Sequence, residues 1–300
     1  KEMSEEIKME GNAPLTTEED LRIAAEITSQ PPFVQIENLY NFRDVGGWDV
    51  DVDLGVDFGV GGERGGDGIE TDGGVGEGRR RVKGRVRKGI LFRGPDLGAL
   101  TTQGEHKLRD ELGVKTILDL RSIPQIERAG GVREVEGVKR VWCPVFEVGM
   151  YSPLNAGRRY GLYCGVGEGI IAAFEEIMEH SAKPSFIPLL EHLASLTPTA
   201  TQPAATLLHC TTGNNRTGIL TALLLSLLGV PDSQIADEYA LSHHGLAATR
   251  EKTVDRLMRN ERFVGVIGDG REGRRKAARM VGARRESMVG FLGRVRERGG

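Results

Sequence analysis

The sequence predicts an α/β protein with a central, mostly parallel sheet flanked by helices. The first observation is a pair of short apolar runs, residues 114–120 and 205–208, which have the length and composition of buried strands. The second is the long apolar run 219–230, which has the length of a buried helix. The third is the helical spacing of apolar residues over 169–180 and 185–195, which predicts two more helices.

The composition is that of an ordinary globular chain, with 300 residues of which 39% are hydrophobic. We expect a helical extension over residues 1–30 and a single α/β domain over 31–300. The net charge of −3 argues against nucleic acid as a partner. No apolar run reaches the roughly 18 residues of a membrane span. Three cysteines without metal-ligand spacing suit a reducing compartment, so we expect a cytoplasmic protein without metal or cofactor. The oligomeric state stays open.

Helix-capping and helix-breaking residues, together with composition, predict the first elements of the chain. A helix is expected before residue 31, because Thr16 or Thr17 can cap it, acidic residues follow the cap, and Pro31 ends it. Residues 33–36 and 86–93 have the composition of short strands.

A glycine-rich segment separates these two strands. Residues 46–89 contain 15 glycines, with acidic residues crowded into 49–77 and basic residues into 79–88. Such a stretch buries too little apolar surface to offset the entropy of ordering it. We therefore expect a flexible insertion into a hairpin over about 50–77, whose oppositely charged halves pair only weakly.

The later elements follow similar signals. A helix is expected over 101–112, because threonines can cap it and a glycine ends it. A further strand is expected over 138–145. Residues 148–168 are expected as a loop, whose aromatic and basic residues form either a substrate rim or an ordinary surface. Two more helices are expected over 231–241 and, with an amphipathic pattern, over 280–292.

The segment 209–218 reads His-Cys-Thr-Thr-Gly-Asn-Asn-Arg-Thr-Gly and joins a predicted strand to a predicted helix. Unpaired amides and the helix dipole make such a junction an anion site. Five residues separate Cys210 from Arg216, which is enough to wrap a loop around a tetrahedral anion that the guanidinium binds. The same field lowers the pKa of the Cys210 thiol, to which the Thr217 hydroxyl can donate. His209 faces the other way and braces the loop. The alternative is a buried structural cysteine before an ordinary turn.

Two other polar pairs are candidates for the same site. Asp119 and Arg121 lie at the carboxyl end of a predicted strand, where open α/β sheets place their sites. Arg121 either helps to position the substrate or the thiolate loop, or only pairs with an acid to brace loops. Arg43 and Asp44 either shape one wall of the site or belong to a turn in which Asp44 accepts backbone amides.

The segment 209–218 resembles the active-site loop of the cysteine-dependent protein tyrosine phosphatase superfamily. More narrowly, it is similar to the bacterial and fungal tyrosine/dual-specificity branch, whose loop usually reads His-Cys-x-Ala-Gly-Lys-Asp-Arg-Thr-Gly. Three further stretches support this resemblance: Asn-Phe-Arg-Asp-Val-Gly-Gly at 41–47, Leu-Phe-Arg-Gly at 91–94 and Thr-Ile-Leu-Asp-Leu-Arg-Ser at 116–122.

The resemblance implies a protein-tyrosine-phosphatase-like fold that hydrolyses phosphomonoesters, such as phosphotyrosine or small aryl phosphates, through a cysteinyl-phosphate. The substrate would be a phosphorylated protein or small molecule. Cys210 would be the nucleophile, and Arg216 would hold the phosphate oxygens. The residues expected to bind substrate are Thr211, Thr212, Gly213, Asn214, Arg43, Asp44, Asp119 and Arg121; Thr217 or Asn215 would orient the attacking water.

Three positions depart from that pattern. Asn214 and Asn215 replace the usual Lys-Asp, and Gln125 replaces an acid. An amide cannot donate a proton on demand, so a substrate with a good leaving group is expected, and the spare acids are Asp44, Asp96 and Asp119. Loss of the lysine argues mildly against inositol lipids. Two alternatives to a phosphatase stay open: a degenerate protein that binds an oxyanion without turnover, and a thiolate enzyme repurposed for another anionic substrate.

Overall fold

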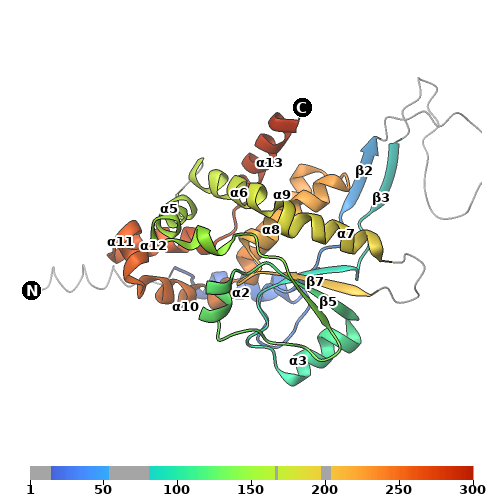
Figure 1. The fold of residues 1–300 in the computed structure, drawn as a ribbon, viewed down its shortest axis with the longest axis horizontal. Coiled ribbons are helices and arrows are strands. Elements are labelled where there is room, and N and C mark those ends of the chain that lie inside the picture. Colours follow the sequence, from blue (N-terminus) through green and yellow to red (C-terminus); the bar gives the residue numbers. More distant parts are fainter. Residues whose placement is uncertain (1–14, 54–80, 166–167, 197–203, 300) are drawn as a thin grey trace, which may run out of the picture.

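The computed structural model describes residues 15–53, 81–165, 168–196 and 204–299 (Figure 1). It confirms the predicted α/β class, because a five-stranded sheet with the order β1-β4-β7-β5-β6 lies among helices. The strands are β1 (Arg43–Asp44), β4 (Leu91–Gly94), β5 (Val114–Asp119), β6 (Lys139–Trp142) and β7 (Ala205–His209). Four strands run parallel, and β1 pairs antiparallel with β4.

Strand β7 is the centre of the sheet and is buried along its whole length. Its register places Gly94 of β4 and Asp119 of β5 opposite His209. The three central strands therefore end at the same level, one residue before Cys210. Strands β5 and β7, both expected as buried strands from their composition, pair in parallel.

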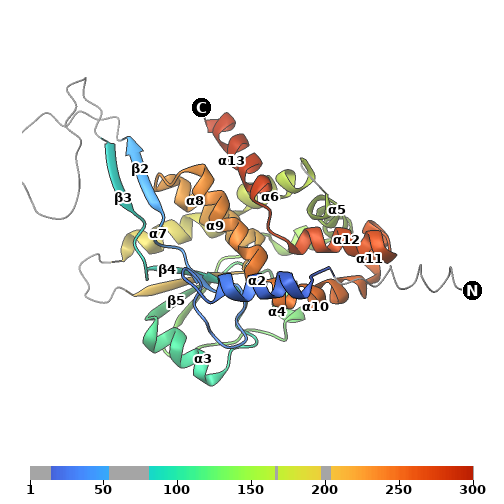
Figure 2. The same ribbon diagram turned by 180° about the vertical axis from the view of Figure 1, so that it is seen from behind.

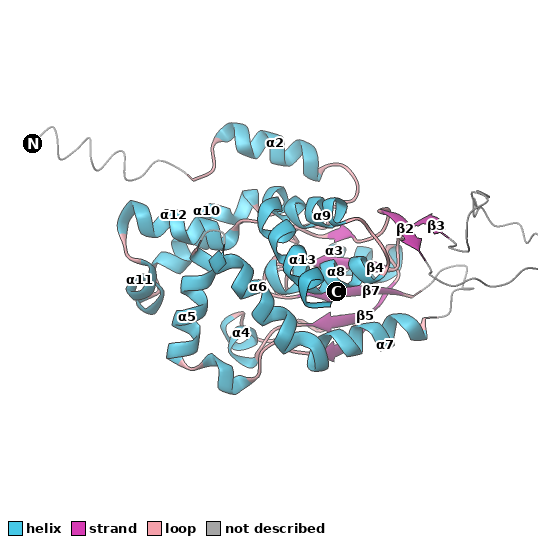
Figure 3. Cartoon of the chain, turned by 90° about the horizontal axis from the view of Figure 1, so that it is seen from above, coloured by secondary structure: helices cyan, strands magenta, loops and turns pink. Residues whose placement is uncertain are grey.

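Helices cover both faces of the sheet (Figures 2 and 3). The helices are α2 (Glu18–Thr28), α3 (Thr102–His106), α4 (Ile123–Arg128), α5 (Pro153–Cys164), α6 (Glu168–Ser181), α7 (Ile187–Ser195), α8 (Asn215–Leu227), α9 (Asp232–Gly245), α10 (Ala247–Met258), α11 (Glu261–Ile267), α12 (Gly270–Val281) and α13 (Arg285–Gly299). Short π-helical turns occupy Lys107–Glu111 and Ala182–Phe186, and a 3-10 turn occupies Val148–Tyr151.

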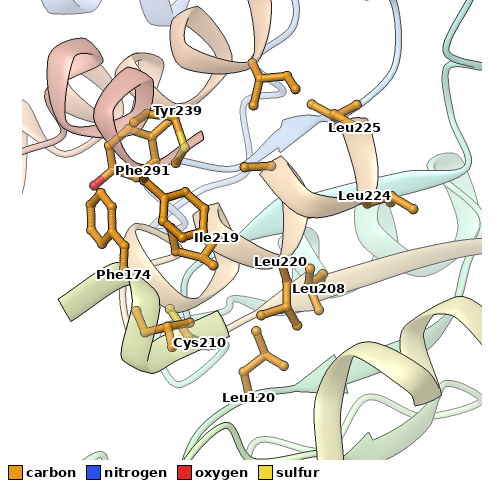
Figure 4. Packing of buried hydrophobic residues seen from close by; sticks show 14 of the residues in the cluster. Leu120, Phe174, Leu208, Cys210, Ile219, Leu220, Leu224, Leu225, Tyr239 and Phe291 are labelled. Carbon is orange, nitrogen blue, oxygen red and sulfur yellow. The ribbon is translucent and has the colours of Figure 1, made fainter. Parts of the chain in front are cut away.

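The alternation of side chains along the strands divides the core into clusters on the two faces. Leu118 and Leu208 pack with α6, α8, α9 and α13, in the cluster that Figure 4 shows. Their neighbours Ile117 and Leu207 pack on the other face, against the α3 side. A third cluster joins α5 to α10, α11 and α12. These four helices lie together at one end of the molecule (Figures 1 and 2).

The helix cap and the hairpin predicted near the start of the chain are both observed. Helix α2 begins after Thr17, whose hydroxyl accepts from the Asp20 amide in a capping box. The predicted hairpin is formed by β2 (Asp49–Asp53) and β3 (Arg81–Arg85), and an ion pair joins Arg85 to Asp49. Most of the insertion predicted over 50–77 lies outside the described residues.

Several predicted boundaries are wrong. Residues 33–36 form no strand; only Phe33 makes an isolated bridge with Arg43. The strand expected over 86–93 is confined to β4, and the one over 138–145 to β6. The segment expected as one amphipathic helix over 280–292 is divided, since α12 ends and α13 begins within it.

The prediction of a loop over 148–168 is wrong, because most of this segment forms α5. Ser152 caps this helix by accepting from the Asn155 amide, and Pro153 occupies its first turn. Two glycines and few apolar residues hide the helical period in the sequence. Arginines near the C-terminus bond carboxylates of neighbouring helices: Arg294, for example, bonds Glu175 on α6 at 3.2 Å.

Candidate active site

The loop between β7 and α8 is closely packed against β4. Gly213 has a φ of +68°, and a Cβ at this position would lie 2.4 Å from the carbonyl oxygen of Gly94. Both the backbone conformation and the lack of space require glycine here. The loop therefore has one tightly fixed path from Cys210 to the first residue of α8.

Five consecutive carbonyl groups of this loop, those of residues 210–214, accept hydrogen bonds from surrounding parts of the protein. The donors are His209 Nδ1 to Cys210 (3.0 Å), the Asp96 amide to Thr211 (3.2 Å), Asn41 Nδ2 to Thr212 (3.1 Å), and Arg93 Nη2 to Gly213 (2.6 Å) and Asn214 (3.1 Å). In a trans peptide the following N–H points away from the carbonyl. Carbonyls that face the scaffold thus turn the amides of residues 211–215 toward the inside of the loop, as an anion nest requires.

Two fully buried arginines support the loop from behind. Arg93 Nη1 bonds Glu238 at 2.5 Å, and Arg43 Nε bonds the other oxygen of Glu238 at 2.8 Å. Arg43 also donates to Asn41 Oδ1 at 2.5 Å, and Asn41 in turn holds the Thr212 carbonyl. Burial, with repulsion by Arg93, lowers the pKa of Arg43 to about 10. Two cations share one carboxylate here, so a net positive charge lies under the loop.

The sequence places Arg43 and Asp44 among the substrate-binding candidates, but the structure brings neither to the pocket. Arg43 has no exposed surface. The Asp44 carboxylate accepts the amides of Gly46 and Gly89, both at 2.8 Å. The alternative interpretation of this stretch, a turn closed by an aspartate, describes what is observed.

Asp119 and Arg121 also lie beside the loop rather than in the pocket. The buried Asp119 carboxylate accepts bonds from the Arg121 guanidinium at 2.9 and 2.8 Å, and from Arg140 Nε and Nη2 at 3.1 and 2.8 Å. Burial would raise the pKa of Asp119, but Arg121, His209 and Arg140 together lower it well below its ordinary value. Asp119 is thus a fixed anion, and the bracing alternative for Arg121 describes its contacts.

The Cys210 thiol is in a field that favours the thiolate. Burial alone would raise its pKa, but Arg216, the Thr217 hydroxyl and the amides of Thr217 and Thr212 outweigh burial and lower it. The Thr217 hydroxyl is buried and has no nitrogen or oxygen partner among the described residues. The sulfur is therefore the acceptor that its proton can reach.

Arg216 lies at the pocket surface with neutral partners. Its guanidinium donates to the Gln125 side-chain oxygen, to Thr211 Oγ at 3.2 Å and to the Leu120 carbonyl at 3.4 Å. Within the described ranges, no carboxylate lies at ion-pair distance from it. Gln125, where the resembling branch often has an acid, is itself placed by the Ser122 amide at 3.2 Å. The charge of Arg216 is thus left for a ligand.

The two loop asparagines are engaged by helices outside the loop. Asn214 Nδ2 donates to the Gly282 carbonyl at 3.0 Å, at the junction of α12 and α13. Asn215 Oδ1 accepts from the Tyr239 hydroxyl at 2.9 Å. Burial raises the pKa of Tyr239 far above its ordinary value, so it stays a donor.

A pocket of about 710 Å³ opens above the loop. Of the predicted site residues, it is lined by Cys210, Thr211, Thr212, Asn214, Asn215 and Arg216, and the spare acid Asp96 joins them. Gly213 and Thr217 belong to the loop without lining the pocket. Sequence reasoning missed most of the wall, which comes from α5, α10, α11 and α12. The one signal for it was the aromatic and basic composition of residues 148–168.

Comparison with known proteins agrees with this geometry. Residues 34–300 match a family described as the tyrosine phosphatase family. The chain belongs to this family. A curated relative named tyrosine-protein phosphatase, from Nostoc commune, is 42% identical over 74 residues, which are 25% of this chain and 23% of the relative. The match thus spans less than a quarter of that phosphatase. Among the helices in the described part of this family member, none has the length and apolar character to cross a bilayer.

Proposed function

We propose that the protein hydrolyses phosphomonoesters through a cysteinyl-phosphate intermediate. The observation that carries this proposal is the set of five outward-facing carbonyls, which turns the loop amides toward a cysteine whose thiol pKa is lowered. Such a loop can stabilise three phosphate oxygens at once. Membership of the tyrosine phosphatase family supports the same chemistry.

In the first step, the Cys210 thiolate attacks phosphorus in line with the leaving oxygen. The S–P bond forms as the P–O bond to the leaving group breaks. The loop amides and Arg216 stabilise the charge on the three equatorial oxygens. The leaving oxygen must gain a proton unless it is already a good leaving group.

Asp96 is the residue that we assign as proton donor. Among the pocket-lining residues of the described chain it is the one carboxylic acid. Its amide donates to the Thr211 carbonyl at 3.2 Å, so its backbone is fixed to the loop. Asp44 and Asp119 are engaged elsewhere, and the Asn215 amide carries no transferable proton.

In the second step, water attacks the phosphorus of the intermediate. Asp96, now a carboxylate, accepts a proton from this water as the S–P bond breaks. Inorganic phosphate leaves, and Cys210 returns as a thiolate. Asn215 lines the pocket and orients the water, whereas Thr217 donates to the sulfur.

Aryl phosphates are the substrates that this site favours. Aromatic side chains of Phe146, Tyr160 and Tyr163 line the pocket and provide packing for a ring. An aryl oxygen also depends less than an alkyl oxygen on the proton from Asp96.

Hydrolysis of p-nitrophenyl phosphate tests the nucleophile. We expect turnover by the wild type, loss of turnover in Cys210→Ser, and retained turnover in the control Cys143→Ser, which alters a buried cysteine outside the pocket. Turnover that survives in Cys210→Ser would contradict the mechanism.

A matched pair of aryl and alkyl phosphates tests the acid. General acid catalysis contributes roughly 10²–10⁴-fold, so Asp96→Asn should lose that much kcat/KM for the alkyl substrate and far less for the aryl one. Asp237→Asn, an exposed aspartate outside the pocket, is the charge-matched control. Equal losses on both substrates would remove Asp96 from this role.

A second candidate is a protein that binds an oxyanion without turnover. It is favoured by one observation: the loop carries Asn214 and Asn215 where the resembling branch has a lysine and an acid, and both amides are bonded to helices. Tight binding of vanadate together with no hydrolysis of any phosphomonoester would support it.

A further inference from the structure

The pocket is far more basic than one phosphate requires. Among the described residues, its lining includes six arginines and a single carboxylate, although the whole chain has a net charge of −3. The arginines are Arg128, Arg159, Arg216, Arg250, Arg256 and Arg262, and the carboxylate is Asp96. Arg216 and the loop amides are sufficient for the scissile phosphate. The presence of the other five arginines around the pocket therefore needs another explanation.

One face of α10 contributes several of these groups. The pocket is lined by residues spaced three or four apart along this helix and its start: Leu246, Thr249, Arg250, Thr253, Arg256 and Leu257. This spacing places them on one face. Four of the six are polar, whereas a helix face that is turned toward the protein is normally apolar.

Arg250 is the most unusual member of this face. It is only 6% exposed, yet its Nε has no hydrogen-bond partner in the described part of the chain. Its other nitrogens donate to Thr16 Oγ at 3.3 Å and the His243 carbonyl at 2.6 Å, both neutral groups. No carboxylate of the described residues lies at ion-pair distance from it, and the charges of Asp20 and Glu251 only partly offset the effect of burial, which lowers its pKa. A buried guanidinium without a paired anion is costly, and an anionic ligand would remove that cost.

The α10 face begins close to the catalytic loop. A Cβ at Gly245 would lie 2.5 Å from Asn41 Oδ1, and Asn41 binds the Thr212 carbonyl. Gly245 ends α9, and α10 starts two residues later and lines the same pocket as Cys210 and Arg216. A second group on a small molecule that binds the loop can therefore reach the α10 face.

We propose that Thr249, Arg250, Thr253 and Arg256 form a second anion subsite, and that the substrate is a compact small molecule carrying two phosphate groups. One phosphate lies in the Cys210 loop, and the other binds the α10 face. This inference rests on the proposed function only for the assignment of the scissile phosphate. It identifies the substrate class by charge.

Calorimetry on the Cys210→Ser protein tests the subsite without turnover. The probes are α,ω-alkanediol bisphosphates of increasing chain length, each paired with the alkyl monophosphate of the same length. We expect one chain length at which the bisphosphate binds at least about tenfold more tightly, since a charged hydrogen bond contributes roughly that factor. This preference should shrink as salt rises.

Variants then locate the second phosphate. Arg256→Gln should reduce the preference for the bisphosphate about tenfold, and Thr253→Val should reduce it less. Arg259→Gln removes the same charge one residue beyond α10 and outside the pocket, so it should leave the preference intact. Arg256 and Arg259 are both exposed, which allows both variants to fold.

Two results would overturn the proposal: bisphosphates that bind no better than monophosphates at every length, or an equal preference in Arg256→Gln and wild type. Failure of the proposed function looks different. A wild type that hydrolyses no phosphomonoester, but whose serine form still prefers bisphosphates, would retain the subsite and reject the phosphatase.

Discussion

Two buried carboxylates flank the catalytic loop, and each lies between two arginines. Glu238 binds Arg43 and Arg93 on the β4 side of β7, and Asp119 binds Arg121 and Arg140 on the β5 side. The Glu238 cluster contacts the loop directly, because Arg93 donates to two of its carbonyls. The Asp119 cluster does not bond these carbonyls. Its nearest link is to His209, whose Nε2 lies 3.6 Å from Asp119 Oδ1.

The clusters also differ in their access to water. Both arginine side chains on Glu238 are fully buried, whereas the Arg140 side chain is 19% exposed. Similar ion triads can therefore serve different purposes. The fully buried Glu238 cluster positions the amides of the catalytic loop. The partly exposed Asp119 cluster holds the end of a strand in place.

The largest expected effect comes from Glu238→Gln. This change leaves two buried guanidinium groups without a counter-charge, so we expect a loss of about 3–5 kcal/mol in the free energy of unfolding. Urea denaturation followed by circular dichroism measures it. A loss below about 1 kcal/mol would show that the two clusters do not differ as described.

The second prediction compares two conservative changes. Arg93→Lys removes the planar donor that holds two loop carbonyls, and a displacement of about 1 Å in such a site costs about 10²-fold in rate. Arg121→Lys disturbs no loop carbonyl and should cost clearly less. The measurement is kcat/KM on p-nitrophenyl phosphate for both variants, and equal losses would remove the distinction between the clusters.

The third prediction concerns acid. Asp119 has a lowered pKa in the folded protein, so its stabilisation is present above its ordinary pKa of about 4 and is lost as the pH falls below that value. Asp119→Asn should destabilise the protein by about 2 kcal/mol near pH 7, less than Glu238→Gln because Arg140 can reach water. In urea titrations, the difference in the free energy of unfolding between Asp119→Asn and wild type should become smaller from pH 4 to pH 2. A difference that stays constant would contradict the lowered pKa of Asp119.

The sequence was sufficient to predict the loop and the central strands. It was insufficient to predict the contacts and helices that surround them. The pattern from residue 209 to 218 is local, and its strand, turn and helix follow from neighbouring residues. The role of Arg93 depends on Glu238, which lies 145 positions further along the chain. The pocket wall depends on α5, where glycines obscure the helical period, and on the packing of α10 beside it. Contacts of this kind are decided by tertiary packing and leave no local pattern.

The smallest effect distinguishes the cysteines. Burial, with the nearby Asp119 charge, raises the pKa of Cys143 to about 12, and burial raises that of Cys164 to about 11. Iodoacetate at pH 6.5 should therefore label Cys210 and leave the other two unmodified. Peptide mass spectrometry with and without phosphate, which should protect Cys210, tests this. Labelling of Cys143 at a similar rate would mean that the Asp119 side of the loop is more open than it is here.

The outward-facing carbonyls have one more consequence. The scaffold sets the shape of the loop before any ligand binds. The loop should therefore bind free phosphate as well as a phosphoryl group, because both offer three oxygens to the same amides. Orthophosphate should then inhibit by competing with substrate. For very reactive esters, release of phosphate from the loop, rather than a chemical step, should be rate-limiting.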